Sequence, residues 1–158
     1  MSKPVVEVQP RAVVPTSGGS AVFLGNQFKN FVIYVDNGVG QAITMFMRHT
    51  TKTRPLTHDL MAHILTALGA KVERVIINDL QEGTYFARLI LSAENELHER
   101  KIVEIDARPS DCIALAVQQN APIYVVEDVW SQVEDMSEVL QKMAEGTDSP
   151  ETNPSEED

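Results

Sequence analysis

The stretch from Lys101 to Val126 constrains the fold most, because it contains a complete strand–loop–helix–strand pattern. Residues 102–105 are mostly β-branched and apolar, which is typical of a buried strand. Pro109 suits the first turn of a helix, where its missing N–H group is not needed, and an apolar run follows it. Asn120 is suited to end that helix, and residues 123–126 predict a second buried strand.

The connection between the first of these strands and the helix is densely charged. It contains Glu104, Asp106, Arg108 and Asp111 within eight residues, whereas the helix that follows is otherwise apolar. Groups of ionisable side chains at such a position favour a binding or catalytic site.

An earlier segment resembles this one at a constant offset of seventy residues. Residues 32–36 (V-I-Y-V-D) align with 102–106 (I-V-E-I-D), and residues 41–43 align with 111–113. Two strand–Asp–helix units in one chain suggest an internal duplication, with the two loops on related faces of the fold. Chance similarity between two strand–helix units is the alternative.

The remaining segments add further strands and helices. We expect strands over residues 4–14, where Pro10 requires an edge or a bulge, and over 21–24, 31–35, 71–78 and 84–92. Helices are expected over 42–48, over 57–68 with Thr57 as N-cap, and from a capping box at Ser131 to Gly146. The predicted fold is therefore α+β, with a mixed, largely antiparallel sheet or sheets and packed helices.

Length and charge indicate one domain with an acidic tail. At 158 residues the chain suits a single domain, which we place at residues 1–145. The net charge of −10 arises entirely from residues 127–158, which hold eleven acidic residues and one basic residue, so the rest of the chain is neutral. Residues 146–158 lack apolar side chains and are expected to be a disordered acidic tail.

The sequence also indicates where the protein resides. Cys112 is the only cysteine, so no intrachain disulfide can form, and its apolar surroundings predict a small buried side chain rather than a catalytic thiol. No basic leader with an apolar run is present, and no window approaches the ~18 apolar residues of a membrane span. We expect a soluble cytoplasmic protein with no membrane partner.

The charged connection is the first candidate site. Asp106 and Asp111 could hold a divalent cation, Mg²⁺ or Mn²⁺, or act as a base, while Arg108 could bind a phosphate. In the structural alternative, Asp106 caps the helix, Asp111 complements the helix dipole and Arg108 pairs with one of them.

The second candidate site lies at residues 54–59. His58 could act as a general acid in the cleavage of nucleic acid, with Arg54 stabilising charge on the phosphate. His58 and Asp59 are adjacent in a helix and so face different directions, which allows a capping turn with a solvated histidine as the alternative. The mechanism requires that this turn lie beside the charged connection, so that both clusters line one pocket.

Common signatures of other enzyme classes are missing. The chain has no Gly-rich phosphate loop, no H-E-x-x-H, no paired C-x-x-C and no G-x-S-x-G. Aromatic residues such as Phe28, Phe31 and Tyr34 fall in apolar runs, so the sequence shows no platform for stacking bases.

Several runs of the sequence carry a family resemblance: 54–60 (R-P-L-T-H-D-L), 69–75 (G-A-K-V-E-R-V), 85–89 (Y-F-A-R-L), 105–115 (I-D-A-R-P-S-D-C-I-A-L) and 121–125 (A-P-I-Y-V). Over roughly residues 5 to 130 the chain resembles the bifunctional nuclease domain family of bacteria. This resemblance implies a compact α+β fold that self-associates and, for some members, cleavage of both RNA and DNA. Cys112 stands where alanine is usual in the family, a change that the helix should tolerate.

The sequence thus leads to three hypotheses. The first is a nuclease that hydrolyses the phosphodiester bonds of RNA and DNA, with Asp106, Asp111 and His58 as catalytic or metal-binding residues and Arg54 and Arg108 on the phosphate. The second is a non-catalytic ligand-binding or regulatory module that uses the same charged loops. The third is an oligomeric scaffold, in which the apolar edge of the hairpin and the C-terminal helix make the subunit contacts. Likeness of fold does not by itself transfer activity.

Overall fold

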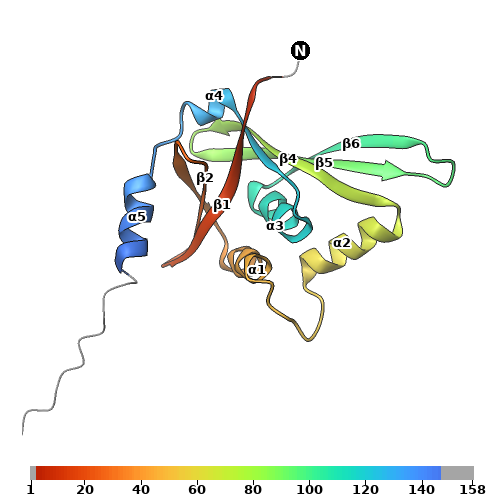
Figure 1. Cartoon of the computed structure of the whole chain (residues 1–158), viewed down its shortest axis with the longest axis horizontal. Helices are drawn as coiled ribbons and strands as arrows, with labels where there is room; N and C mark the ends of the chain where they lie inside the picture. The colour runs from red at the N-terminus through yellow and green to blue at the C-terminus, as the bar shows by residue number, and fades with distance from the viewer. Residues whose placement is uncertain (1–2, 147–158) are drawn as a thin grey trace, which may run out of the picture.

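The computed structural model describes residues 3–146. Within that range the chain forms seven strands and five helices, which Figure 1 shows in chain order. The strands are β1 (Val5–Thr16), β2 (Gly19–Gly25), β3 (Asn30–Val35), β4 (Ala70–Gln81), β5 (Thr84–Glu94), β6 (Arg100–Ala107) and β7 (Ile123–Val126). The helices are α1 (Asn37–Met47), α2 (Thr57–Ala67), α3 (Pro109–Gln119), α4 (Glu127–Trp130) and α5 (Ser137–Gly146). The predicted tail lies outside the described residues, apart from Gly146.

All seven strands belong to one sheet with the order β3-β2-β1-β7-β4-β5-β6. Every neighbouring pair is antiparallel except β4 and β7, which run parallel. The prediction of an α+β fold with a mixed, largely antiparallel sheet is therefore confirmed.

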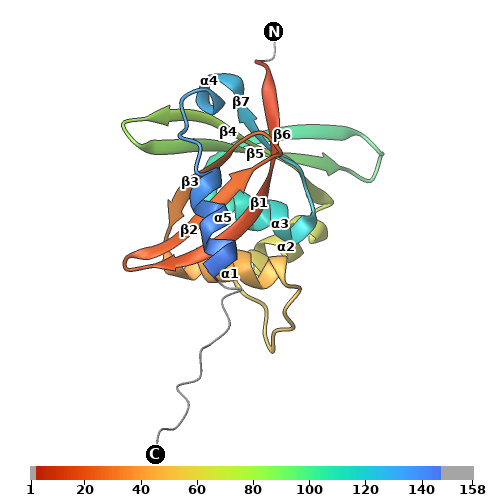
Figure 2. The same ribbon diagram turned by 60° about the vertical axis from the view of Figure 1, so that its left-hand side comes forward.

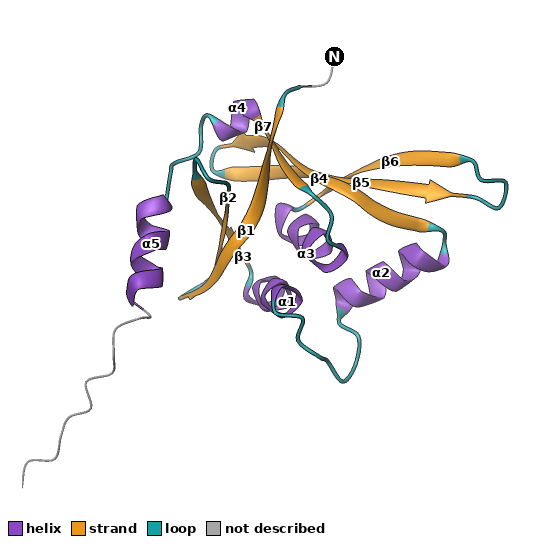
Figure 3. Ribbon diagram, in the orientation of Figure 1, coloured by secondary structure: helices purple, strands orange, loops and turns teal. Residues whose placement is uncertain are grey.

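The chain builds the same arrangement twice. The strands β1, β2 and β3 form an antiparallel meander that leads into α1, and β4, β5 and β6 form a second meander that leads into α3. Strand β7 lies between β1 and β4 and joins the two meanders. Helices α1 and α3 are both 11 residues long and pack against each other, as Figure 3 shows. This order agrees with the duplication suggested by the sequence.

The core lies between the sheet and these two helices. The two groups of strands meet at an angle, and α3 lies between them (Figures 1 and 2). Val22, Leu24, Ile43, Ile77 and Ile113 are completely buried, with none of their surface accessible to solvent. Burial of a side chain of this size contributes about 1.5–3 kcal/mol, so the apolar positions of both meanders fix the helices on the sheet.

Local signals in the sequence are mostly borne out. Pro10 lies at a bulge in β1, where the pairing with β2 shifts register. Pro109 occupies the first turn of α3, and Asn120 ends that helix in a left-handed conformation with φ of 55°. Gly69, with φ of 72°, follows α2 as expected.

Two helix boundaries differ from the prediction. Leu56, not Thr57, is the N-cap of α2, and the Asp59 carboxylate accepts a hydrogen bond from its amide over 2.8 Å. The helix expected from Ser131 to Gly146 begins only at Ser137, as α5; the short α4 ends before it at Trp130, and residues 131–136 form a turn and a loop. Helix α5 begins later because the Asp135 carboxylate accepts a hydrogen bond from the Ser137 amide over 3.0 Å.

Helix α2 contributes little to the core. Of its side chains only His58 is buried, while the apolar side chains Leu60, Met61 and Ile64 are exposed, as is Leu68 at the C-cap. The apolar stripe that the sequence indicates is therefore real, but it lies largely on the surface.

None of the helices within residues 3–146 has the length and apolar character that crossing a bilayer requires.

Candidate functional site

Three helices begin around one cluster of charged side chains. Asp36 follows β3 and is the N-cap of α1, and its Oδ1 accepts a hydrogen bond from the Val39 amide over 3.0 Å. Arg108 follows β6 and is the N-cap of α3, but its side chain makes no capping hydrogen bond. His58 and Asp111 lie in the first turns of α2 and α3. N-cap positions and first helical turns therefore supply the whole cluster.

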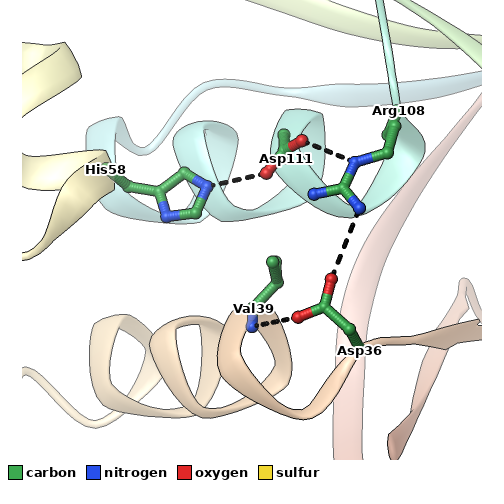
Figure 4. A network of polar contacts seen from close by, with 5 residues as sticks. All are labelled: Asp36, Val39, His58, Arg108 and Asp111. Carbon is green, nitrogen blue, oxygen red and sulfur yellow. Dashed lines mark hydrogen bonds and ion pairs between the residues drawn. The ribbon is translucent and has the colours of Figure 1, made fainter.

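Arg108 joins the two repeated units. Its Nε donates a hydrogen bond to Oδ2 of Asp111 over 3.0 Å, and its Nη1 lies 3.4 Å from Oδ2 of Asp36 (Figure 4). Asp36 belongs to the first meander–helix unit, whereas Arg108 and Asp111 belong to the second. The guanidinium group uses two of its five N–H groups for these bonds and keeps three for another acceptor.

Asp111 also joins this ion pair to His58. Its Oδ1 lies 3.0 Å from Nε2 of the histidine, which comes from a different helix (Figure 4). An ionised carboxylate only accepts hydrogen bonds, so Nε2 carries the hydrogen and the neutral ring keeps its lone pair on Nδ1. Within residues 3–146, Nδ1 has no hydrogen-bond partner.

The surroundings hold the histidine in place. His58 is 6% exposed, and the ring of Phe46 from α1 packs edge-on against it at 6.4 Å between centroids. Asp59, its neighbour in sequence, faces Lys52 and Gln118 instead, as the helical geometry predicts. His58 is therefore fixed by packing and by Asp111, and it is separated from Asp59.

The charges in the cluster support one another. Burial alone would raise the pKa of the Asp111 carboxyl group, but the hydrogen bonds from Arg108 and His58 outweigh burial and keep that pKa below its ordinary value. The hydrogen bond to Asp111, followed by that residue's charge, raises the pKa of Arg108. Asp111 is thus an anion and Arg108 a cation across the physiological pH range.

The cluster lines a cavity of about 620 Å³. Apolar walls come from α1, α2, β5 and α3, and the lining also includes Asp36, His58, Arg108 and Asp111. Such a combination of apolar walls with a few convergent polar groups is typical of a ligand site. Cys112 also lines this cavity, but burial raises the pKa of its thiol to about 12, which agrees with the prediction of a buried, unreactive side chain.

Two of the residues predicted for the site lie outside this cluster. Arg54 is exposed on the loop before α2 and has no ion pair with any other described residue. Asp106 is exposed on β6, with Oδ1 3.9 Å from Nη1 of Arg88. It precedes Ala107, which lines the cavity, and successive strand residues point to opposite faces, so Asp106 faces away from the cavity.

Asp106 does not cap α3 either, and no three His, Cys, Asp or Glu side chains within residues 3–146 are grouped so that they could hold a metal ion.

Sequence reasoning missed Asp36 as a site residue. The signal was present in the repeat, which aligns Asp36 with Asp106 and places both loops on related faces. The N-caps Asp36 and Arg108 are, however, 72 residues apart, so the structural equivalence is shifted by two from the sequence alignment. Asp36 therefore meets Arg108 rather than Asp106.

Comparison with known proteins places the chain among related sequences. A family model described as "Bifunctional nuclease domain" matches residues 22–138, which is most of the chain. Two proteins described as uncharacterized, from two strains of Mycobacterium tuberculosis, are each 38% identical to it over 100 residues. Each match covers 63% of this chain and 56% of the relative, so the chain spans little more than half the length of these curated relatives.

Proposed function

The chain belongs to the bifunctional nuclease domain family, and on that premise we propose that it hydrolyses the phosphodiester bonds of RNA and DNA at the cluster of His58, Asp111 and Arg108. The observation that supports this proposal most is the hydrogen-bonded chain from His58 through Asp111 to Arg108 beside one cavity. A base that is oriented by a carboxylate, next to a cation, is the combination that phosphodiester hydrolysis needs.

His58 handles the proton in this proposal. Asp111 holds the hydrogen on Nε2, so Nδ1 is free to accept a proton from an attacking water. The water oxygen then bonds to phosphorus as the ester P–O bond breaks. The leaving oxygen takes a proton from solvent, and His58 later releases the one it accepted. The sequence predicted His58 as an acid, whereas in this proposal the ring acts as the base.

Arg108 stabilises the phosphate. Its three unused N–H groups can donate to the non-bridging oxygens, where charge accumulates in the transition state. Asp36 and Asp111 hold the guanidinium group between them, so its position is set before the substrate arrives. Asp36 is therefore a positioning residue, since it acts through Arg108.

A divalent cation fits this cluster only in part. Mg²⁺ commonly binds through one or two carboxylates together with substrate phosphates and water, and here Asp36 and Asp111 are the carboxylates that line the cavity. When bound there, such an ion would lower the charge on the phosphate. Asp106 faces away, so the predicted pair of Asp106 and Asp111 is replaced in this proposal by Asp36 and Asp111.

The decisive experiment measures cleavage of fluorescent single-stranded RNA and DNA by the purified chain, with EDTA, Mg²⁺ or Mn²⁺. We expect cleavage by the wild type and a loss of at least about 100-fold in His58→Gln and Arg108→Ala. Arg88→Ala is the matched control, because Arg88 is an arginine that contacts Asp106 on the opposite face of the sheet. Equal cleavage by all four proteins would show a contaminating nuclease or another site.

A non-catalytic ligand-binding or regulatory module is the second candidate. It is favoured by the pairing of Arg108 with two carboxylates, because such ion pairs also serve to fix helices. This candidate predicts that the wild type binds a labelled oligonucleotide without cleaving it under any metal condition. Arg108→Ala would then weaken binding of the oligonucleotide, and neither the wild type nor this variant would show cleavage.

We also propose that the chain self-associates, as the resemblance implies. The exposed apolar side chains of α2 are one described surface that would support contact with a second copy, because exposed apolar groups of this kind often mark interfaces. Cytoplasmic localisation stays a prediction. A contact of the exposed Arg54 with a phosphate of the nucleic-acid substrate also stays a prediction.

A further inference from the structure

A second cavity lies on the other side of Arg108. It has a volume of about 400 Å³ and shares Asp36 and Arg108 with the candidate site. Its other walls come from the end of β3, the turn between β4 and β5, and the first residues of α3, including Tyr34 and Ser110. Arg108 therefore stands between two cavities and has unused N–H groups for a ligand in either.

The start of α3 has unpaired backbone donors, and its first two residues, Pro109 and Ser110, line this second cavity. Pro109 has no N–H group, and the first amide bonded within the helix is that of Cys112, which donates to the Arg108 carbonyl over 3.1 Å. The amides of Ser110 and Asp111 precede it, and α3 has no side-chain cap. Free amides at a helix N-terminus, together with the helix dipole, favour a bound anion.

Ser110 is an independent sign of a ligand at this place. It is 7% exposed, so more than nine-tenths of it is buried, and it lines the second cavity. Its hydroxyl group has no hydrogen-bond partner among residues 3–146. Its oxygen is not among the fully buried polar atoms that lack a partner in this range, so it is accessible from the cavity, beside free amides and an arginine.

We propose that the second cavity binds the phosphate of the nucleotide next to the one being cleaved, held by the Ser110 hydroxyl, the α3 amides and Arg108. This inference rests on the proposed nuclease function. A substrate would then be held through two successive phosphates, one on each side of Arg108. The preferred substrate is accordingly an oligonucleotide rather than a small phosphodiester.

The ring of Tyr34 is placed to stack on the base of that nucleotide. It lines the same cavity on the edge strand β3, is 74% exposed, and has no ring contact with another described aromatic residue. The sequence placed Tyr34 in an apolar run, yet its neighbours Ile33 and Val35 are buried and Tyr34 is not. An exposed ring stacks on an unpaired base, so the cavity favours single strands over duplexes.

The test compares two substrates that differ only in what the second cavity can hold. Bis(para-nitrophenyl) phosphate reaches the first cavity alone, whereas a fluorescent single-stranded DNA oligonucleotide reaches both. We expect Ser110→Ala to raise the KM for the oligonucleotide at least about tenfold and to leave the cleavage of the small diester unchanged. Ser20→Ala, at another buried serine, is the control and should change neither.

Tyr34→Ala is a second variant whose fold is not at risk, because the side chain is exposed. It should weaken binding of the oligonucleotide about fivefold or more, and an abasic oligonucleotide should bind the variant and the wild type equally. Equal effects of Ser110→Ala on both substrates, or no effect on either, would overturn the inference.

The proposed function can fail separately. If the wild type cleaves neither substrate, that function is wrong, while binding of the labelled oligonucleotide, measured by fluorescence anisotropy, still tests the cavity. Unchanged affinity in both Ser110→Ala and Tyr34→Ala would then overturn the inference by itself.

Discussion

Replacing Asp111 with asparagine tests the link on which the proposed mechanism depends. Asparagine has the same size, but it has one acceptor oxygen and one NH₂ donor. Arg108 has donors only, so the amide oxygen must remain with Arg108 and the NH₂ group must face His58. The histidine would then accept at Nε2 and carry its hydrogen on Nδ1, so the NH₂ group would occupy its lone pair and Nδ1 could no longer accept a proton from water.

The expected loss of activity is large and the loss of stability is small. A carboxylate-to-amide change that fixes the wrong histidine tautomer lowers kcat about 10⁴-fold in serine proteases, and we expect roughly 10³-fold to 10⁴-fold here. Arg108 is 63% exposed at its side chain, so the lost ion pair costs at most about 1 kcal/mol. With the weaker contact to His58, the free energy of unfolding should fall by about 1–2 kcal/mol.

Two assays separate these effects. Cleavage of fluorescent single-stranded RNA measures activity, and urea unfolding followed by Trp130 fluorescence measures stability. Asp106→Asn is the matched control, because it makes the same chemical change at an exposed aspartate on the other face of β6. Retention of activity within about tenfold of the wild type in a folded Asp111→Asn protein would refute the role given to Asp111. Equal losses in both variants would refute the assignment of the cavity.

Three further predictions concern stability and association. Burial alone would raise the pKa of Asp59, but its hydrogen bonds and the charge of Lys52 outweigh burial and keep that pKa below 3.8. The contribution of Asp59 to stability is therefore present above pH 3.8 and lost as the pH falls through the lowered pKa. Urea unfolding across this pH range should show the loss in the wild type and less of it in Asp59→Asn. Gly25→Ala should destabilise the fold by more than about 1 kcal/mol in thermal unfolding, because a Cβ there would lie 2.3 Å from a backbone oxygen. Gly18→Ala is the control and should unfold like the wild type, because a Cβ there meets nothing within 4 Å. Ile64→Lys should leave the unfolding temperature nearly unchanged and, if α2 contacts a second copy, reduce the sedimentation coefficient to that of a monomer; an unchanged coefficient would remove α2 from the interface.

The elements that could be predicted are those with strong local signals. The strand–helix–strand stretch from β6 to β7 follows the prediction because Pro109 and Asn120 mark the helix ends and the apolar runs have the right length. The charged connection was also recognised, since its residues are close in sequence. Local chemistry sets these features, so no knowledge of distant contacts was needed.

The features that could not be predicted depend on contacts between distant segments. Helix α5 begins late because Asp135 is also held by the amide of Asn30, 105 residues earlier. Asp36 meets Arg108 across 72 residues, and nothing near Asp36 indicates this contact. Tyr34 was grouped with buried aromatic residues, but it lies on an edge strand at a position that points away from the core.

The connection between α1 and α2 separates, along the chain, the residues that form the charged cluster. Asp36 lies before it, whereas His58, Arg108 and Asp111 lie after it. A proteolytic nick in this connection would leave each fragment with one meander and an incomplete set of side chains. Reassembly of the fragments would restore the ion pair between Asp36 and Arg108. The complete cluster would then exist only in the reassembled protein, and its activity would report that the two fragments had bound each other.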